Sequence, residues 1–328
     1  MKQFLILAKL AVAGGLLWFV LHNVGIEKVT IRMSGADKLL IVLGIAQLSI
    51  QPLLGAWRWR IALSALANPL PFGQLCRITY IGTFFGQILP ATVGGDGIRI
   101  WLAYRDGCSV KNAVSSVAIE RLIMLLTLIL MVTITAPWLA SLLQFGQLAV
   151  LAPVLLMVGV ISLILFIAIC GRDPGAFRWQ MLRGMGHLAA ATRQIFFNIP
   201  ATLSLVGLSI VSYLNIILTV FIFAWAVGQA VSYVWFLVLI PPVLLASTLP
   251  ISTGGWGTRE LAMVLVLRAV NIDGDAALLV SALLGLASVV ISLPGAVYYV
   301  LRWSSGRERP PLTGSTVSDA PGGAGGRA

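Results

Sequence analysis

Charged residues are scarce in this chain. Only 10% of its 328 residues are Asp, Glu, Lys or Arg, whereas 59% are apolar and the mean hydropathy is +0.98. A soluble domain of this length needs many more polar side chains to cover its surface, so the composition excludes that class. The chain is therefore expected to be a membrane protein.

Histidine and cysteine are also rare. The two histidines, His22 and His187, lie outside every motif described below, and Cys76, Cys108 and Cys170 have no metal-ligand spacing. Each cysteine lies in or beside an apolar segment, which is typical of a structural thiol. The sequence offers no Asp-rich pair either, so we expect neither a metal centre nor a cofactor.

Long apolar runs are abundant. A helix needs about 20 residues to cross roughly 30 Å of hydrocarbon. Runs of about this length lie at 4–21, 36–56, 113–138, 148–170, 201–228 and 276–301. The first is interpreted as a retained span, not a signal peptide, because it is long and lacks a small-residue cleavage site. The sequence thus predicts an all-α polytopic membrane protein with about six full spans.

Two further apolar stretches, 72–89 and 232–249, lead into a duplicated motif. Residues 89–99 read LPATVGGDGIR and residues 249–259 read LPISTGGWGTR, sharing the pattern L-P-x-[ST]-x-G-G-x-G-x-R. Matched Gly/Pro breaks in two halves of a membrane protein point to a transport site.

The motif has the chemistry of an anion site. Proline ends the preceding helix, Thr92 or Ser252 is placed to cap a new one, and glycines let backbone N–H groups approach a ligand. A helix start carries unpaired N–H donors, and the later arginine adds a bidentate donor. The predicted substrate-binding residues are Thr92, Gly94, Gly95, Asp96, Arg99, Ser252, Gly254, Gly255 and Arg259. The alternative is that the glycines only permit tight helix packing.

Several ionisable residues lie in or against the apolar segments, where such residues usually pair and face the bundle interior. They are Asp96, Glu120, Arg121, Arg259 and Glu260. Asp96 precedes Arg99 by one helical turn, the spacing of a facing pair. We assign Glu120, Arg121 and Glu260 to coupling or to ion pairs, because a buried carboxylate holds its proton more tightly and can couple transport to proton uptake. Structural ion pairs are the alternative.

Basic residues predict the topology, because Lys and Arg concentrate in cytoplasmic loops. Clusters lie at Lys2, Arg58 and Arg60, Arg105 and Lys111, at 172–193 and at 302–309. All are cytoplasmic, as are both termini, only if 72–104 is a hairpin that enters and leaves on the inside. Segment 232–270 is then a hairpin entering from outside. The alternative is that 72–89 crosses outright.

This topology predicts an inverted repeat with two oppositely oriented re-entrant hairpins. Its units are at about 36–138 and 201–301, within one integral membrane domain, 1–303. The linker 171–200 is predicted to be a helix in the cytoplasmic interface or a basic connector. The tail, 304–328, is expected to be disordered and cytoplasmic. The net charge of +11 favours anionic lipid headgroups over nucleic acid as partners.

A family resemblance rests on four segments. They are RWR at 58–60, the first motif copy, AIER at 118–121, and the second copy with its following Glu260. Together they resemble the lysylphosphatidylglycerol synthase transmembrane-region family, also called flippase-like membrane proteins, over nearly the whole chain to about Arg302. The resemblance implies a bacterial-type cytoplasmic (inner) membrane protein, related to others in hopanoid, polyprenyl and further lipid-linked pathways. We expect no soluble aminoacyl-transferase domain and hence no lysyltransferase activity.

Three functions follow from these observations. The leading hypothesis is a lipid transporter, not an enzyme, that moves an anionic phospholipid or a polyprenyl-phosphate-type lipid between leaflets through a midplane site. The second is a membrane-embedded transferase acting on a lipid phosphate, and the third is an ion or small-solute secondary transporter. A lipid carrier needs a side opening to the bilayer, whereas a solute carrier needs an enclosed aqueous site.

Overall fold

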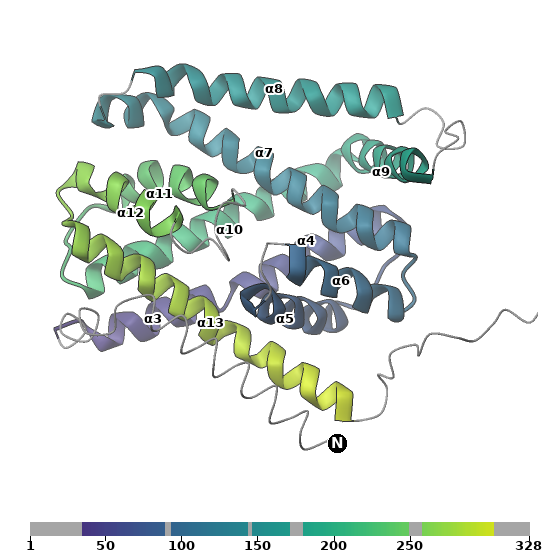
Figure 1. Ribbon diagram of the computed structural model, residues 1–328, viewed down its shortest axis with the longest axis horizontal. Coiled ribbons are helices and arrows are strands. Elements are labelled where there is room, and N and C mark those ends of the chain that lie inside the picture. The colour runs from purple at the N-terminus through teal and green to yellow at the C-terminus, as the bar shows by residue number, and fades with distance from the viewer. Residues whose placement is uncertain (1–34, 89–92, 144–145, 171–179, 249–257, 305–328) are drawn as a thin grey trace, which may run out of the picture.

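The computed structural model describes residues 35–88, 93–143, 146–170, 180–248 and 258–304, which form helices and their connections (Figure 1). The helices are α3 (Lys38–Leu48), α4 (Gln51–Ala65), α5 (Phe72–Ile88), α6 (Val93–Arg105), α7 (Val110–Leu143), α8 (Gln147–Cys170), α9 (Gln180–Phe197), α10 (Ile199–Ala226), α11 (Tyr233–Ser247), α12 (Thr258–Leu267), the 3-10 turn η3 (Arg268–Val270) and α13 (Gly274–Ser304). The predicted all-α class is confirmed for these residues.

Among the described residues, five helical segments are long and apolar enough to cross a membrane. They are Lys38–Ala65, Val110–Leu142, Val150–Ile169, Ile199–Ala226 and Gly274–Leu301. Five of the six predicted spans coincide with these candidate spans, and the sixth, 4–21, lies outside the described residues. The apolar stretches 72–89 and 232–249 correspond to the shorter helices α5 and α11, each followed along the chain by another short helix, α6 or α12.

The first span is broken between α3 and α4. Asp37 caps α3, its Oδ1 accepting hydrogen bonds from the backbone N–H groups of Leu39 at 2.8 Å and Leu40 at 3.3 Å. Pro52 stands in the first turn of α4, where its missing N–H is tolerated. The chain therefore ends one helix and starts another inside a single apolar segment.

The extent of α4 corrects the prediction that Arg58 belongs to a cytoplasmic loop. The helix continues to Ala65, and Arg58 is buried in it with 5% of its surface exposed. The neighbouring Ala62 and Leu63 are also fully buried. An arginine inside an apolar helix is tolerated when its charge is paired in the bundle interior, and this pairing is described below.

Two main hydrophobic cores divide the molecule. The larger one lies mainly in α10, α11, α12 and α13, where it includes Phe223 and Phe236, and it also includes Leu48 of α3 and Leu139 of α7. The second joins α4, α5 and α6 around Trp59 and Leu75. Figure 1 shows the α5–α6 pair and the α11–α12 pair on opposite sides of the middle of the molecule.

The helix contacts have an internal correspondence. Helix α5 packs on α6, α4 and α13, whereas α11 packs on α12, α10 and α7. Helix α7 contacts α4 and α6, and α13 likewise contacts α10 and α12. The α3–α4 segment packs on α10 itself. The two sets of contacts therefore correspond to each other. In this correspondence α3–α4 takes the place of α10, α5 that of α11, α6 that of α12 and α7 that of α13.

Glycines allow α5 to approach its neighbours closely. Gly95 of α6 is buried against Gly82 and Gly86, and a Cβ placed on it would collide with the Gly82 carbonyl oxygen. A Cβ placed on Gly295 of α13 would likewise collide with the backbone of Tyr80. These are the close contacts that small residues permit between membrane helices.

The linker and α8 lie at the edge of the bundle. Helix α8 packs on α7 and α9 (Figure 1), and most of its large apolar side chains are exposed. The predicted linker helix exists as α9, which buries Ala191 and Ile195 against α4, α7 and α10 and exposes Arg193. Its position in a membrane interface stays a prediction.

Candidate functional site

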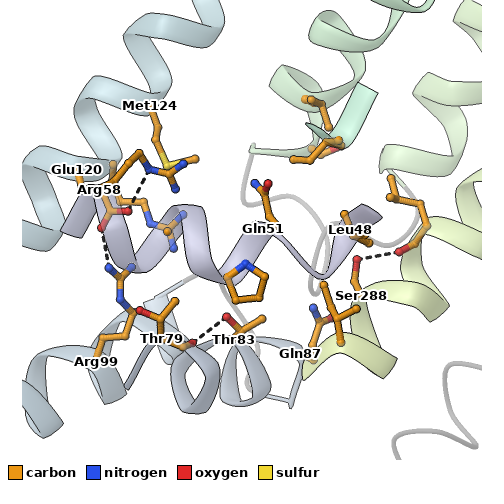
Figure 2. Close-up of a pocket in the computed structure, with 18 of the residues that line it drawn as sticks. Leu48, Gln51, Arg58, Thr79, Thr83, Gln87, Arg99, Glu120, Met124 and Ser288 are labelled. Carbon is orange, nitrogen blue, oxygen red and sulfur yellow. Dashed lines mark hydrogen bonds and ion pairs between the residues drawn. The ribbon is translucent and has the colours of Figure 1, made fainter. Parts of the chain in front are cut away.

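A cavity of about 340 Å³ lies between two groups of helices, which we call the halves of the bundle (Figure 2). Its walls come from α3 to α7 and α10 to α13. Four arginines line it, together with Glu120: Arg58, Arg99, Arg121 and Arg259. The two motif arginines, Arg99 and Arg259, are distant in sequence, and the fold brings both of them to one cavity.

Glu120 lies between two of these guanidinium groups, as Figure 2 shows. Its Oε2 accepts a hydrogen bond from Arg99 Nη2 at 2.6 Å, and its Oε1 lies 3.4 Å from Arg58 Nε. Arg58 Nη1 also donates to Ser212 Oγ on α10. No more than 7% of any of the three charged side chains is exposed. Glu120 thus joins α4, α6 and α7 and compensates two buried cations.

The Trp59 ring packs against the guanidinium of Arg99. The Arg99 Cζ lies 4.4 Å from the centre of the Trp59 ring, a cation–π contact. The indole Nε1 donates to Ser116 Oγ at 2.9 Å, which fixes the ring against α7. The guanidinium of Arg99 is therefore held by an aromatic face as well as by Glu120.

Asp96 and Arg121 form a second, more accessible pair. Arg121 donates from Nε to Asp96 Oδ2 at 2.7 Å and from Nη2 to Oδ1 at 2.8 Å, a bidentate contact. Arg99 Nη1 lies 3.2 Å from the same carboxylate, which confirms the predicted facing pair. Arg121 exposes 52% of its side chain while Asp96 exposes 13%, so Arg121 is the guanidinium most open to an incoming ligand.

The second half contributes a smaller cluster. Arg259 Nη2 donates to Glu260 Oε1 at 3.0 Å, and Arg259 Nε donates to Ser281 Oγ on α13 at 3.1 Å. Ser281 Oγ in turn donates to Glu260 Oε1 at 3.3 Å. Arg259 and Glu260, which are adjacent in sequence, thus form an ion pair with each other. Glu120, in contrast, contacts Arg58 and Arg99 and not its sequence neighbour Arg121.

Two buried donors facing the cavity have no hydrogen-bond partner within the described part of the chain. They are Arg99 Nε and Thr79 Oγ1. Arg99 is 6% exposed and Thr79 is 5% exposed, and both line the cavity. A buried polar atom left unpaired costs about 1–3 kcal/mol. These two side chains of the cavity wall therefore have a hydrogen-bond donor that no described residue accepts from.

Uncharged polar side chains continue the lining. Thr79, Thr83 and Gln87 follow one another at four-residue spacing along α5, as Figure 2 shows, and Gln51, Ser247 and Ser288 line the cavity from other helices. None of these six residues was predicted from the sequence. The spacing of Thr79, Thr83 and Gln87 could have indicated them, because residues four apart lie on the same face of a helix and these three interrupt an apolar run.

The available ligand groups are suited to an anion and not to a metal. Within the described ranges, no group of three His, Cys, Asp or Glu side chains is placed to hold a metal ion. The carboxylates near the cavity contact arginines at the distances given above. What remains for a ligand is guanidinium, hydroxyl and amide groups, which suit a phosphate or carboxylate.

Comparison with known families agrees with this architecture. The model of the lysylphosphatidylglycerol synthase transmembrane region matches residues 6–295, which include every residue that lines the cavity. This chain belongs to that family. The resemblance seen in the sequence is thereby confirmed. No curated protein matches the chain.

The structure of this lysylphosphatidylglycerol synthase transmembrane-region protein describes only part of the set predicted to bind substrate. Thr92, Ser252, Gly254 and Gly255 lie outside the described residues. Gly94 and Gly95 lie on α6, and Gly95 has the packing position described above.

The acidic residues of this family member have the partners that structural ion pairs require. Asp96 does not line the cavity itself but pairs with Arg121, which does. Glu120 and Glu260 each contact an arginine that lines the cavity. Proton coupling by Glu120 and Glu260 stays a prediction from the sequence.

Proposed function

We propose that this protein moves an anionic lipid or lipid-linked phosphate between membrane leaflets through the cavity. The observation that carries the proposal is that Arg99 and Arg259, which occupy equivalent positions in the two motif copies, line the same cavity. Guanidinium groups bind phosphate oxygens through charge-assisted, often bidentate hydrogen bonds. Membership of a lipid-related membrane family supports a lipid as the ligand.

The bundle works as an inverted repeat in this proposal. The exchange of corresponding helix contacts between α3–α7 and α10–α13 supports it. Helices α6 and α12 have 13 and 10 residues, and about 20 are needed to cross the hydrocarbon. The pairs α5–α6 and α11–α12 are therefore assigned as re-entrant hairpins that approach the midplane from opposite sides.

Transport follows from rocking one half against the other. The larger hydrophobic core lies mainly in α10–α13 and also includes Leu48 of α3 and Leu139 of α7, whereas the second lies in α4–α7. In this proposal the two groups of helices move as units. The contact between α3–α4 and α10 is common to both halves and serves as the pivot. The headgroup is held at the arginines while its acyl chains stay in the bilayer, and each hairpin in turn closes one side of the cavity.

The test is reconstitution in liposomes with anionic lipids labelled on an acyl chain, followed by quenching from outside. We expect the protein to increase the fraction of label reached by the quencher, and Arg99→Ala to abolish the increase. Excess inorganic phosphate on both sides tests the solute-transporter alternative. Mass analysis of the recovered lipid tests the transferase alternative. Unaccelerated lipid movement, strong competition by free phosphate, or a chemically altered lipid would each overturn the proposal.

A further inference from the structure

We infer that a groove on the outside of the bundle, separate from the cavity, binds an anionic phospholipid by its phosphate. The groove has a volume of about 390 Å³ and is formed by α4 and by the turn between α9 and α10. None of its lining residues also lines the cavity between the two halves. The lipid bound here stays in place and is not the one transported, so this inference does not depend on the proposed function.

Arg60 is the residue of the RWR segment that the cavity does not use. Arg58 lines the cavity and Trp59 packs against Arg99, and both are buried. Arg60 is exposed and lines the groove instead. Residues two apart on a helix point about 200° away from each other, so Arg58 and Arg60 lie on opposite faces of α4. One short segment thus supplies a guanidinium group to each of two sites.

The groove has a positive charge that no carboxylate of its own helices balances. Helices α4, α9 and α10 contain no Asp or Glu. Within the described ranges, no ion pair includes Arg60. The other polar side chains of the lining are Ser64 and Asn198, which are uncharged. Guanidinium, hydroxyl and amide donors together suit a phosphate group.

The groove lies at the boundary of two candidate membrane spans. Segment Lys38–Ala65 ends at the groove, and segment Ile199–Ala226 begins there. The chain therefore leaves the apolar region along α4 at the same level at which it enters again along α10. Lipid headgroups lie in this boundary layer. The topology predicted from the basic residues makes it the cytoplasmic side, whose leaflet carries anionic lipids.

The same face of α4 offers an apolar surface to the acyl chains. Ile50, Leu53 and Trp57 are exposed, and they repeat at three- and four-residue spacing. Arg60 and Ser64 continue this spacing towards the end of the helix and are exposed as well. Residues at this spacing share one helix face, which therefore changes from apolar to polar as a phospholipid does. Free phosphate would use only the polar end, so the face favours a lipid.

The walls of the groove are held together without a ligand. Gln194 of α9 donates from Nε2 to the Ala65 carbonyl oxygen of α4 at 2.7 Å. Ala62, Ile195 and Leu205 belong to one buried cluster that joins α4, α9 and α10. The site is therefore formed before the lipid arrives, which lowers the entropy cost of binding. A lipid that contacts both walls should stabilise the folded protein.

The first experiment measures protection of a thiol in the groove. Ser64→Cys is made after the native cysteines are replaced, and the protein is washed free of lipid in an uncharged detergent. We expect phosphatidylglycerol at ten times its Kd to slow labelling by a soluble thiol reagent about tenfold, because only about a tenth of the grooves then stay open. Ser141→Cys, exposed near the end of α7, is the matched control and should not be protected.

The comparison ligands distinguish a lipid from its parts. Phosphatidylcholine should protect much less, because α4, α9 and α10 offer no carboxylate to its ammonium group. Inorganic phosphate should give no protection, because it has no acyl chains. Equal protection by phosphatidylglycerol and phosphatidylcholine, or strong protection by inorganic phosphate, would overturn the inference. A thiol that is unreactive in the lipid-free protein would also overturn it, because a protein segment or a second copy would then cover the groove.

Variants assign the protection to Arg60. Arg60→Gln is expected to weaken the binding of phosphatidylglycerol about tenfold or more, since it removes charge-assisted hydrogen bonds. Arg77→Gln, which removes an exposed arginine from α5, should leave the protection unchanged. The melting temperature is a second readout that needs no introduced cysteine. Phosphatidylglycerol should raise it more in the wild type than in Arg60→Gln. Equal effects on these two proteins would overturn the inference.

Arg99→Ala separates the groove from the cavity. This variant is expected to lose lipid movement and to keep the protection of Ser64→Cys, because Arg99 does not line the groove. Loss of protection in Arg99→Ala would show that the lipid acts from the cavity, which would overturn the inference. Intact protection in a wild-type protein that moves no lipid would overturn the proposed function and leave the groove standing.

Discussion

Arg99 Nη2 lies 2.6 Å from Glu120 Oε2, and this contact joins α6 to α7 beside a cavity in the middle of the bundle. Glu120 also faces Arg58, so a single carboxylate serves two cations that are almost fully buried. This arrangement links stability and ligand binding, because the group that keeps Arg99 in place also limits the positive charge offered to a ligand.

The first prediction concerns Glu120. Glu120→Gln leaves Arg58 and Arg99 without their shared counter-charge, and breaking a buried pair in this way costs about 3–5 kcal/mol. Glu260 exposes 16% of its side chain, whereas Glu120 exposes 3%. We therefore expect Glu120→Gln to lower the melting temperature of the purified protein much more than Glu260→Gln does. Equal melting temperatures for the two variants would contradict a structural role for the Glu120 contacts.

The second prediction concerns the motif arginines. Arg99→Ala and Arg259→Ala are each expected to abolish lipid movement without preventing membrane insertion, since each charge-assisted hydrogen bond is worth about 1.5–3 kcal/mol. Lysine at either position should restore only part of the rate, because it lacks the planar fork of donors. The matched control is Arg77→Ala, an exposed arginine on α5. Wild-type rates in both alanine variants would show that the arginines do not bind substrate.

The third prediction concerns the crossing of α5 and α13. Gly295→Ala places a Cβ against the Tyr80 backbone, which cannot move aside as a side chain can. Overpacking of this kind costs about 1–3 kcal/mol, so the melting temperature should fall. Gly207→Ala in α10 is the control, because a Cβ there meets nothing within 4 Å and alanine favours the helix. A Gly295→Ala protein as stable as Gly207→Ala would show that the helices are not so close.

The fourth prediction concerns topology. Single cysteines at Arg105, Lys111 and Arg183 should be labelled from the cytoplasmic side, and one at Asp273 from outside. The native cysteines are replaced first, so that only the introduced thiol reacts. Cys108 is expected to contribute little labelling even when it is present, because burial raises the pKa of its thiol. Labelling of position 105 from outside would show that the first hairpin crosses the membrane instead of turning back.

The sequence predicted the long apolar helices well. Apolar runs such as 201–228 and 276–301 became α10 and α13, because a long apolar helix must leave water whatever its neighbours are. The Asp96–Arg99 pair was also predictable, since residues three apart face the same side of a helix. The duplicated motif placed two arginines at equivalent positions, and both line the cavity.

Only the tertiary structure decided which charges meet. The sequence predicted Arg58 to belong to a basic loop cluster. It is buried instead, because α4 extends past it and Glu120 of α7 pairs with it. Glu120 and Arg121 are adjacent in sequence but take different partners, Arg99 and Asp96. Consecutive residues on a helix point about 100° apart, so each faces a different neighbour. That neighbour is set by how distant helices pack, which the local sequence does not contain.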